Sequence, residues 1–167
     1  RPYCSFGDIH LYGNISTVKG LKHNMPYCFS DDLYPGVPLL KLHAIEPHRP
    51  LTFGDINVMP FVVLHGQMPI LAYRFGQLAY ITDMKTIGND ELQYLKDVEV
   101  LIINALRFEK EHHSHQLVSE AIDFSRQLGA RRTILTHLTH QIGLHEKASK
   151  RLPIGVEFGY DGMQVEL

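Results

Sequence analysis

Polar side chains stand at the ends of four segments that are expected to be strands. They are His65, Asp83, Asn104 and His137, after apolar runs that end at Leu64, Thr82, Ile103 and Leu135. In sheets flanked by helices, loops at strand ends converge on one crevice. The two histidines and the aspartate are common ligands of divalent metals. Singly, such a histidine is usually a hydrogen-bonded structural residue and the aspartate could cap a turn, but the joint pattern favours a metal site.

A second group of candidate residues precedes an amphipathic segment, in the run Glu111-His112-His113-Ser114-His115. We interpret His112 and His113 as part of a solvated helix entrance. His115 lies at the threshold of the expected helix, where its ring can face a pocket beside the sheet. There it could serve as a general acid.

A third group contains two histidines separated by two residues, His137 and His140, in Leu135-Thr136-His137-Leu138-Thr139-His140. On a tight loop the two could bind one metal or two neighbouring metals. On a regular strand, an offset of three residues would put them on opposite faces. The spacing alone leaves these alternatives open.

Composition limits the class of protein. The chain has 167 residues, 44% of them hydrophobic, which is enough for one globular domain, expected over residues 1–167. A net charge of −2 gives no general attraction for nucleic acid. The apolar runs are too short to span a membrane, so we expect no membrane partner and a cytoplasmic location. Cys4 and Cys28 form no redox motif, and we expect them to be buried thiols.

The elements that position these residues follow from apolar alternation and turn signals. In the first part we expect a strand over Ile9–Tyr12, a helix capped by Ser16 that ends before Pro26, and a strand over Leu40–Ala44. A meander of short antiparallel strands follows, bounded by glycine turns. Its strands are expected over Leu51–Phe53, Ile56–Leu64, Ile70–Phe75 and Ala79–Thr82.

Helices and strands alternate in the last part of the chain. A helix is expected to begin at Asn89, and Gly129 should end a helix of which Leu117, Ala121 and Leu128 form one face. Two buried strands, a basic helix and a closing hairpin complete the prediction. Their ranges are Val98–Ile103, Arg131–Leu135, His145–Leu152, and Gly155–Phe158 paired with Met163–Leu167.

Together these segments resemble the C-terminal two-thirds of a metallo-β-lactamase-fold hydrolase, most closely the phosphodiesterases related to the phosphoribosyl cyclic phosphate enzyme, with tRNase Z more distant. The resemblance is carried by Val63-Leu64-His65-Gly66, Leu71-Ala72-Tyr73-Arg74-Phe75, Tyr80-Ile81-Thr82-Asp83, the helix entrance His115–Ile122, Leu135–His140 and Tyr160-Asp161-Gly162. It implies an α/β fold, a partial αββα sandwich with mixed sheets that lacks its N-terminal part.

The resemblance also implies roles for individual residues. His65 and His137 correspond to metal ligands of the family, and Asp83 to the carboxylate that bridges two metals. His115 resembles the histidine that assists the leaving oxygen. His140 is similar to a histidine that helps to hold a separate structural zinc.

One departure from the family pattern limits these roles. The signature His-x-His-x-Asp-His, which supplies most of the metal ligands, occurs nowhere in the 167 residues, nor does the early Cys-x-Cys-x-x-Cys segment. We expect both to belong upstream of Arg1. A complete family member would hold two zinc or manganese ions, whereas His65, Asp83 and His137 can hold a single ion in principle.

The resemblance implies a metal-dependent phosphodiesterase that acts on a small cyclic or nucleotide-like phosphodiester, with metal-activated water as the nucleophile. This chain is expected to be inactive without the missing signature, and to self-associate as a homo-oligomer that covers exposed apolar surface. The alternative is a non-catalytic binding or scaffold domain that retains the fold. A nuclease related to tRNase Z would need a basic groove, and residues 145–151 are better explained as a solvated helix face.

Overall fold

The computed structural model describes residues 7–30 and 36–166. Contacts between residues divide the chain into two compact units, residues 1–49 and 50–167. The prediction of one domain over residues 1–167 stays a prediction. Cys4 lies outside the described residues, whereas Cys28 is a buried free thiol, as predicted.

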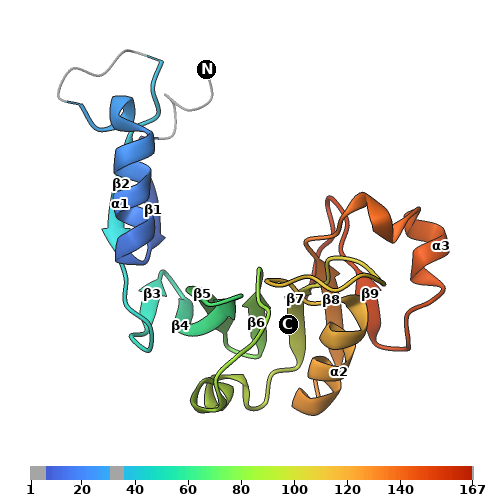
Figure 1. Cartoon of the computed structure of the whole chain (residues 1–167). Helices are drawn as coiled ribbons and strands as arrows, with labels where there is room; N and C mark the ends of the chain where they lie inside the picture. Colours follow the sequence, from blue (N-terminus) through green and yellow to red (C-terminus); the bar gives the residue numbers. More distant parts are fainter. Residues whose placement is uncertain (1–6, 31–35, 167) are drawn as a thin grey trace. The chain divides into compact units, whose positions relative to one another are not determined.

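In the first unit, two parallel strands are joined through a helix (Figure 1). Strand β1 spans Ile9–Gly13, α1 spans Ile15–Asn24, a short 3-10 helix spans Pro26–Cys28, and β2 spans Leu40–Ala44. The prediction that Ser16 caps the helix is wrong. The cap is Asn14, because its backbone is extended and its side chain accepts a hydrogen bond from Thr17 N at 2.8 Å.

The second unit is built on a seven-stranded sheet with the strand order β3-β4-β5-β6-β7-β8-β9. The strands are β3 (Leu51–Phe53), β4 (Ile56–His65), β5 (Met68–Phe75), β6 (Leu78–Ile81), β7 (Val100–Asn104), β8 (Arg132–Thr136) and β9 (Val156–Phe158). The first four pair antiparallel, and β6 to β9 pair parallel. The predicted meander and the α/β class with mixed sheets are therefore confirmed.

Strand direction determines at which edge of the sheet the candidate site residues lie. Two antiparallel steps, from β4 to β5 and from β5 to β6, give β4 the same direction as β6. Strands β7, β8 and β9 follow that direction because they pair parallel. The carboxyl ends of β4, β6, β7 and β8 consequently meet at one edge of the sheet, which we call the carboxyl edge.

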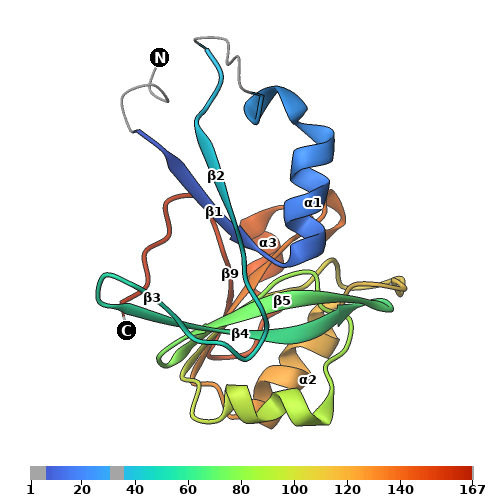
Figure 2. The same cartoon turned by 90° about the vertical axis from the view of Figure 1, so that its left-hand side faces the viewer.

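Helix α2 (Val118–Leu128) packs against β7 and β8 and lies on one face of the sheet (Figure 2). Its buried side includes Val118 and Ala121. The core of this unit consists of apolar side chains from the sheet, from this helix, from the loop after β6 and from the 3-10 helix Asn89–Leu95. Its largest members are Phe61, Val63, Ile81, Met84, Leu95, Leu101, Ile103, Leu135 and Phe158.

The predicted helix start at Asn89 is confirmed, and the helix is of the 3-10 type over Asn89–Leu95. Two other predictions for the C-terminal part need correction. Helix α3 spans His145–Ser149 and is shorter than predicted. The closing hairpin is wrong, because β9 pairs parallel with β8 and residues 163–166 form no strand. No helix in the described ranges is long and apolar enough to cross a membrane.

Substitution of Gly129, the residue that follows the last residue of α2, tests why the helix ends there. Its φ of 72° is left-handed and a Cβ there would meet no atom within 4 Å, so Gly129→Ala should lower the free energy of unfolding by about 1 kcal/mol through backbone strain alone. Gly20, inside α1 with equally open space, is the control, and Gly20→Ala should be neutral or stabilising. Thermal unfolding measures both, and equal midpoints would contradict this explanation.

Candidate metal centre

Four ligand-type side chains meet at the carboxyl edge of the sheet. His65 is the last residue of β4, Asp83 follows β6, His137 follows β8, and His115 comes from the loop between β7 and α2. Asp83 Oδ1 lies 3.1 Å from His115 Nε2 and 3.2 Å from His137 Nε2. Asp83 therefore contacts both His137 and His115, whereas the group whose ligand atoms all lie within 4.8 Å of one another combines His65 and Asp83 with His115 rather than with His137. The prediction that His65, Asp83 and His137 hold one metal stays a prediction.

The imidazole rings contact one another around the carboxylate. The ring centroid of His115 lies 4.6 Å from that of His65 in an edge-on arrangement, and 4.7 Å from that of His137 in a stacked one. One ligand atom each from His65, Asp83 and His115 lies within 4.8 Å of the others, and this is the group of three such residues found in the described part of the chain.

The backbone turns sharply where two of these side chains leave the sheet. Asp83 and His137 both have φ of 58°, a left-handed conformation that is uncommon for residues other than glycine. The carboxyl ends of β6 and β8 therefore break abruptly, and the loop conformation directs each side chain toward the other. Backbone strain of this kind persists only where the surrounding structure holds it in place.

Asn104 holds the strained loop after β6 in place. This side chain is fully buried at the end of β7. Its Oδ1 accepts a hydrogen bond from Met84 N at 2.8 Å, and its Nδ2 donates to Met84 O at 2.9 Å. The two bonds fix the residue next to Asp83, so Asn104, the fourth polar residue at a strand end, is a positioning residue.

The loop that carries His115 is closed at its base by backbone hydrogen bonds. Leu106 N donates to Gln116 O at 2.9 Å, and Val118 N donates to Arg107 O at 3.0 Å. A capping carboxylate adds a further link. Glu120, in the first turn of α2, accepts from Leu117 N and pairs with Lys85 at 2.7 Å, which joins α2 to the loop after Asp83.

Burial and neighbouring imidazoles set the charge of His115. Burial is the largest cause that lowers its pKa, and the charges of His137 and His65 lower it further, while the hydrogen bond to Asp83 acts in the opposite direction. The lowered pKa favours the neutral ring at neutral pH. A neutral imidazole is the form that ligates metal.

His112 contacts the site as well, which the sequence did not indicate. His112 Nδ1 lies 3.1 Å from His115 Nδ1, and Ser114 Oγ lies 3.1 Å from the same His115 nitrogen. The interpretation of His112 as a solvated helix entrance is wrong, because its ring is half-buried against His115. His113 is exposed, as predicted. Within a loop, no periodicity distinguishes the two.

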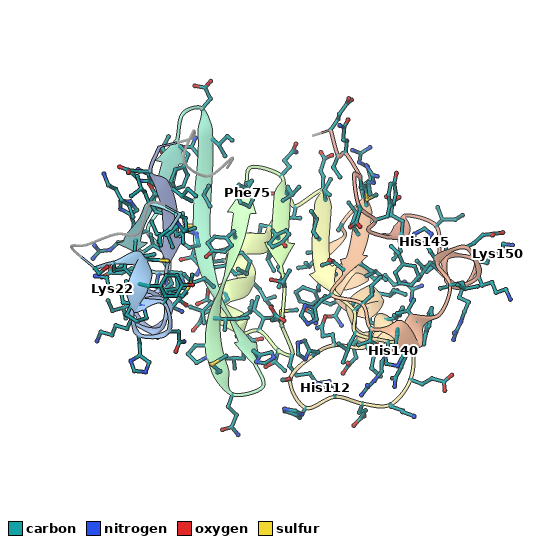
Figure 3. The ribbon with its side chains drawn as sticks, turned by 90° about the horizontal axis from the view of Figure 1, so that it is seen from above. Lys22, Phe75, His112, His140, His145 and Lys150 are labelled. Atoms are coloured by element: carbon teal, nitrogen blue, oxygen red, sulfur yellow. The ribbon has the colours of Figure 1, made fainter. Side chains whose placement is uncertain are left out.

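His140 begins a short 3-10 helix, His140–Ile142, and its side chain is exposed. It is labelled with His112 in Figure 3, where both lie on loops at the same end of the sheet. His140 does not join the group formed by His65, Asp83 and His115. Its role as a ligand of a separate zinc stays a prediction.

The chemistry of the donor set fits a divalent cation. Three imidazoles surround one carboxylate, and nitrogen with carboxylate oxygen is a usual ligand set of zinc. His65, Asp83, His115 and His137 are thus the residues of this chain that could hold a metal.

Comparisons with known proteins identify the family and the fold. The family model described as the beta-lactamase superfamily domain matches residues 3–138. The chain belongs to the beta-lactamase superfamily. Its fold is the metallo-β-lactamase fold. A crystal structure of Zn²⁺-bound PqqB from Methylobacterium extorquens is 16% identical, with a TM-score of 0.70 over 96% of this chain and 65% of that one, a likeness that shows the fold alone.

Two relatives are more similar to this superfamily member in sequence. A crystal structure titled as a new diphosphatase from the PhnP family is 30% identical, with a TM-score of 0.82 over 93% of this chain and 56% of that one. A Porphyromonas gingivalis protein named octanoyltransferase is 38% identical over 164 residues. That match covers 98% of this chain and 33% of the relative, so the chain spans one third of the curated protein it matches.

Asp83 is expected to be required for zinc binding. Asp83→Ala should weaken zinc affinity by at least about tenfold, because it removes the one carboxylate of the cluster. Isothermal titration calorimetry on the metal-free chain measures this. Asp123→Ala, which removes a carboxylate that is 66% exposed on α2, is the matched control. Equal zinc affinity for the two variants would count against the site.

Asn104→Ala should affect both stability and metal binding. It leaves Met84 N and O buried without partners, so we expect the free energy of unfolding to fall by about 2–3 kcal/mol. Zinc affinity should fall about 10–100-fold because Asp83 is released. Denaturant unfolding and zinc titration check this, and a stability loss with unchanged zinc affinity would refute a positioning role.

Proposed function

We propose that this chain is part of a metal-dependent hydrolase that acts on a small phosphodiester or diphosphate. The main support for this proposal is the arrangement of His65, His115 and His137 around Asp83. The chain is also 30% identical to a protein titled a diphosphatase. Divalent metal, zinc or manganese, is the cofactor of this proposal. The substrate is small because the net charge of −2 does not favour a nucleic-acid polymer.

His65, Asp83 and His137 would hold the metal in this function. When bound, a divalent ion polarises a phosphoryl oxygen and lowers the pKa of a water molecule, which supplies the nucleophile. His115 Nε2 lies 3.1 Å from Asp83 Oδ1, so with the Asp83 carboxylate engaged by the metal its N–H would be free to donate to the leaving oxygen. The Ser114 hydroxyl, 3.1 Å from His115 Nδ1, would hold the ring in orientation.

Octanoyl transfer is not part of the proposal. The relative with that name is matched over 33% of its length, so its name describes a protein of which two thirds have no counterpart here.

A non-catalytic binding domain is the second candidate. One observation favours it for these 167 residues alone: the signature His-x-His-x-Asp-His is absent from them. The chain then offers three or four ligands to one ion and lacks the residues of a second site. Self-association and a cytoplasmic location also stay predictions.

The experiment is hydrolysis of bis(p-nitrophenyl) phosphate by the natural polypeptide that contains these residues, loaded with zinc or manganese. We expect turnover that falls at least about 100-fold in Asp83→Ala and in His115→Ala, because each removes a group that holds the metal or the leaving oxygen. Asp123→Ala should match the unchanged protein. The isolated chain should be inactive.

Two results would decide against the hydrolase. If the metal-loaded natural polypeptide left the diester intact, or if His115→Ala and Asp83→Ala turned over as fast as Asp123→Ala, the activity would not come from this site. Stoichiometric metal without turnover would support the binding domain instead.

A further inference from the structure

A buried serine lies between two imidazoles of the loop that carries His115. Ser114 is 3% exposed, and its Oγ lies 3.2 Å from His112 Nδ1 and 3.1 Å from His115 Nδ1. The backbone N–H of Ser114 also donates to His112 Nδ1, at 3.3 Å. We call this group of three residues, His112, Ser114 and His115, the serine bracket.

Each hydrogen bond of the serine bracket has an identifiable donor. The backbone N–H of Ser114 can only donate, so His112 Nδ1 is an acceptor. A carboxylate can only accept, so the hydrogen between Asp83 Oδ1 and His115 Nε2 belongs to the ring. A neutral ring has one N–H, which leaves His115 Nδ1 to accept from the Ser114 hydroxyl. The two Nδ1 atoms, 3.1 Å apart, thus accept from the same serine.

The serine bracket determines which ring atom of His115 faces Asp83. Rotation about the Cβ–Cγ bond of a histidine is broad and roughly two-fold, so the shape of the ring distinguishes poorly between two orientations. A half-turn would put the carbons Cδ2 and Cε1 where Nδ1 and Nε2 now lie, and both hydrogen bonds would be lost. Because the side chain of His115 is only 12% exposed, few water molecules can reach the ring to replace them.

The turn between β4 and β5 packs closely against the serine bracket. Gly66 has a left-handed backbone, with φ of 62°, and a Cβ on this residue would lie 3.5 Å from Ser114 Cβ and 3.6 Å from His113 O. This turn directly follows His65, whose ring contacts the ring of His115 edge-on. The loop is therefore held by the hairpin as well as by the backbone hydrogen bonds at its base.

The two neighbouring histidines of this loop differ in their contacts. The ring centroid of His112 lies 4.9 Å from that of His115. His113 is exposed and stacks on His112, with the centroids 4.5 Å apart. His112 is thus linked to the candidate metal centre through Ser114 and His115, whereas His113 stands outside the serine bracket and offers a matched control.

We propose that His112 and Ser114 are positioning residues, which hold the His115 ring so that the N–H of Nε2 is directed to the leaving oxygen of the substrate. The inference rests on the proposed function for the reaction itself, and it adds His112 to the residues on which that reaction depends. Asp83 is also a candidate metal ligand. The hydrogen bond from Ser114 is therefore the contact of the ring that involves no metal ligand, and it keeps Nε2 available to the substrate.

Hydrogen exchange of the Ser114 amide in the metal-free chain, measured by NMR, tests the serine bracket without any catalysis. His112→Ala should speed the exchange at least about tenfold, because the amide loses its acceptor. His112→Asn should keep most of the protection, since its Oδ1 is bonded to Cγ as Nδ1 is in histidine. His113→Ala should exchange as the unchanged chain does. Equal exchange in the unchanged chain and in all three variants would overturn the bracket.

A kinetic comparison on the metal-loaded natural polypeptide tests the positioning role. Diphenyl phosphate releases a more basic phenolate than bis(p-nitrophenyl) phosphate does, so its hydrolysis depends more on a hydrogen-bond donor to the leaving oxygen. His112→Ala and Ser114→Ala should lower kcat about tenfold more for diphenyl phosphate than for the nitrophenyl diester, with KM unchanged. His112→Asn should recover most of this loss, and His113→Ala should match the unchanged polypeptide.

The outcomes separate this inference from the proposed function. Equal losses of kcat for the two diesters would overturn the positioning role, because partial unfolding lowers both rates alike, and so would a loss in His112→Asn as large as that in His112→Ala. Unchanged thermal midpoints in His112→Ala and Ser114→Ala would show that a loss is not due to unfolding. If the unchanged polypeptide hydrolysed neither diester while the Ser114 amide exchanged as expected, the proposed function would be refuted and the serine bracket would stand as the feature that orients His115.

Discussion

The candidate metal centre depends on the conformation of the short loop after β6, which places the Asp83 carboxylate next to the imidazole rings of His65, His115 and His137. Asp83 has a left-handed backbone, which is unfavourable for an aspartate in isolation. The paired hydrogen bonds between Asn104 and the backbone of Met84 offset that cost. Because Asn104 is buried at the end of β7, the position of the carboxylate is determined by the packing of the sheet itself.

Sheet topology explains why the ligands converge from distant parts of the sequence. His65 precedes His137 by more than seventy residues, yet both leave strands that point the same way. The antiparallel hairpins before β6 restore the strand direction that the parallel strands after it maintain. The candidate metal centre thus follows from strand directions that place the carboxyl ends of β4, β6, β7 and β8 at one edge.

Sequence reasoning brought His65, Asp83 and His137 to one edge of the sheet because apolar runs end sharply before them, but it did not predict that His115 would join His65 and Asp83 in the closest group of ligand atoms. It did not reveal the role of Asn104, whose partner Met84 lies twenty residues away and contributes only backbone atoms. Local signals also failed at the C-terminus. The turn residues Asp161 and Gly162 favoured a hairpin, but β9 instead satisfies its backbone groups by pairing with β8, a non-local interaction that no local pattern encodes.

Anomalous diffraction from crystals of this chain soaked with zinc tests the account most directly. The account predicts a peak at the zinc edge about 2.0–2.2 Å from a carboxylate oxygen of Asp83 and from nitrogens of the surrounding histidines. A zinc peak elsewhere, for example between the exposed His10 and His43 whose ring nitrogens lie 2.8 Å apart, with none at Asp83, would contradict it.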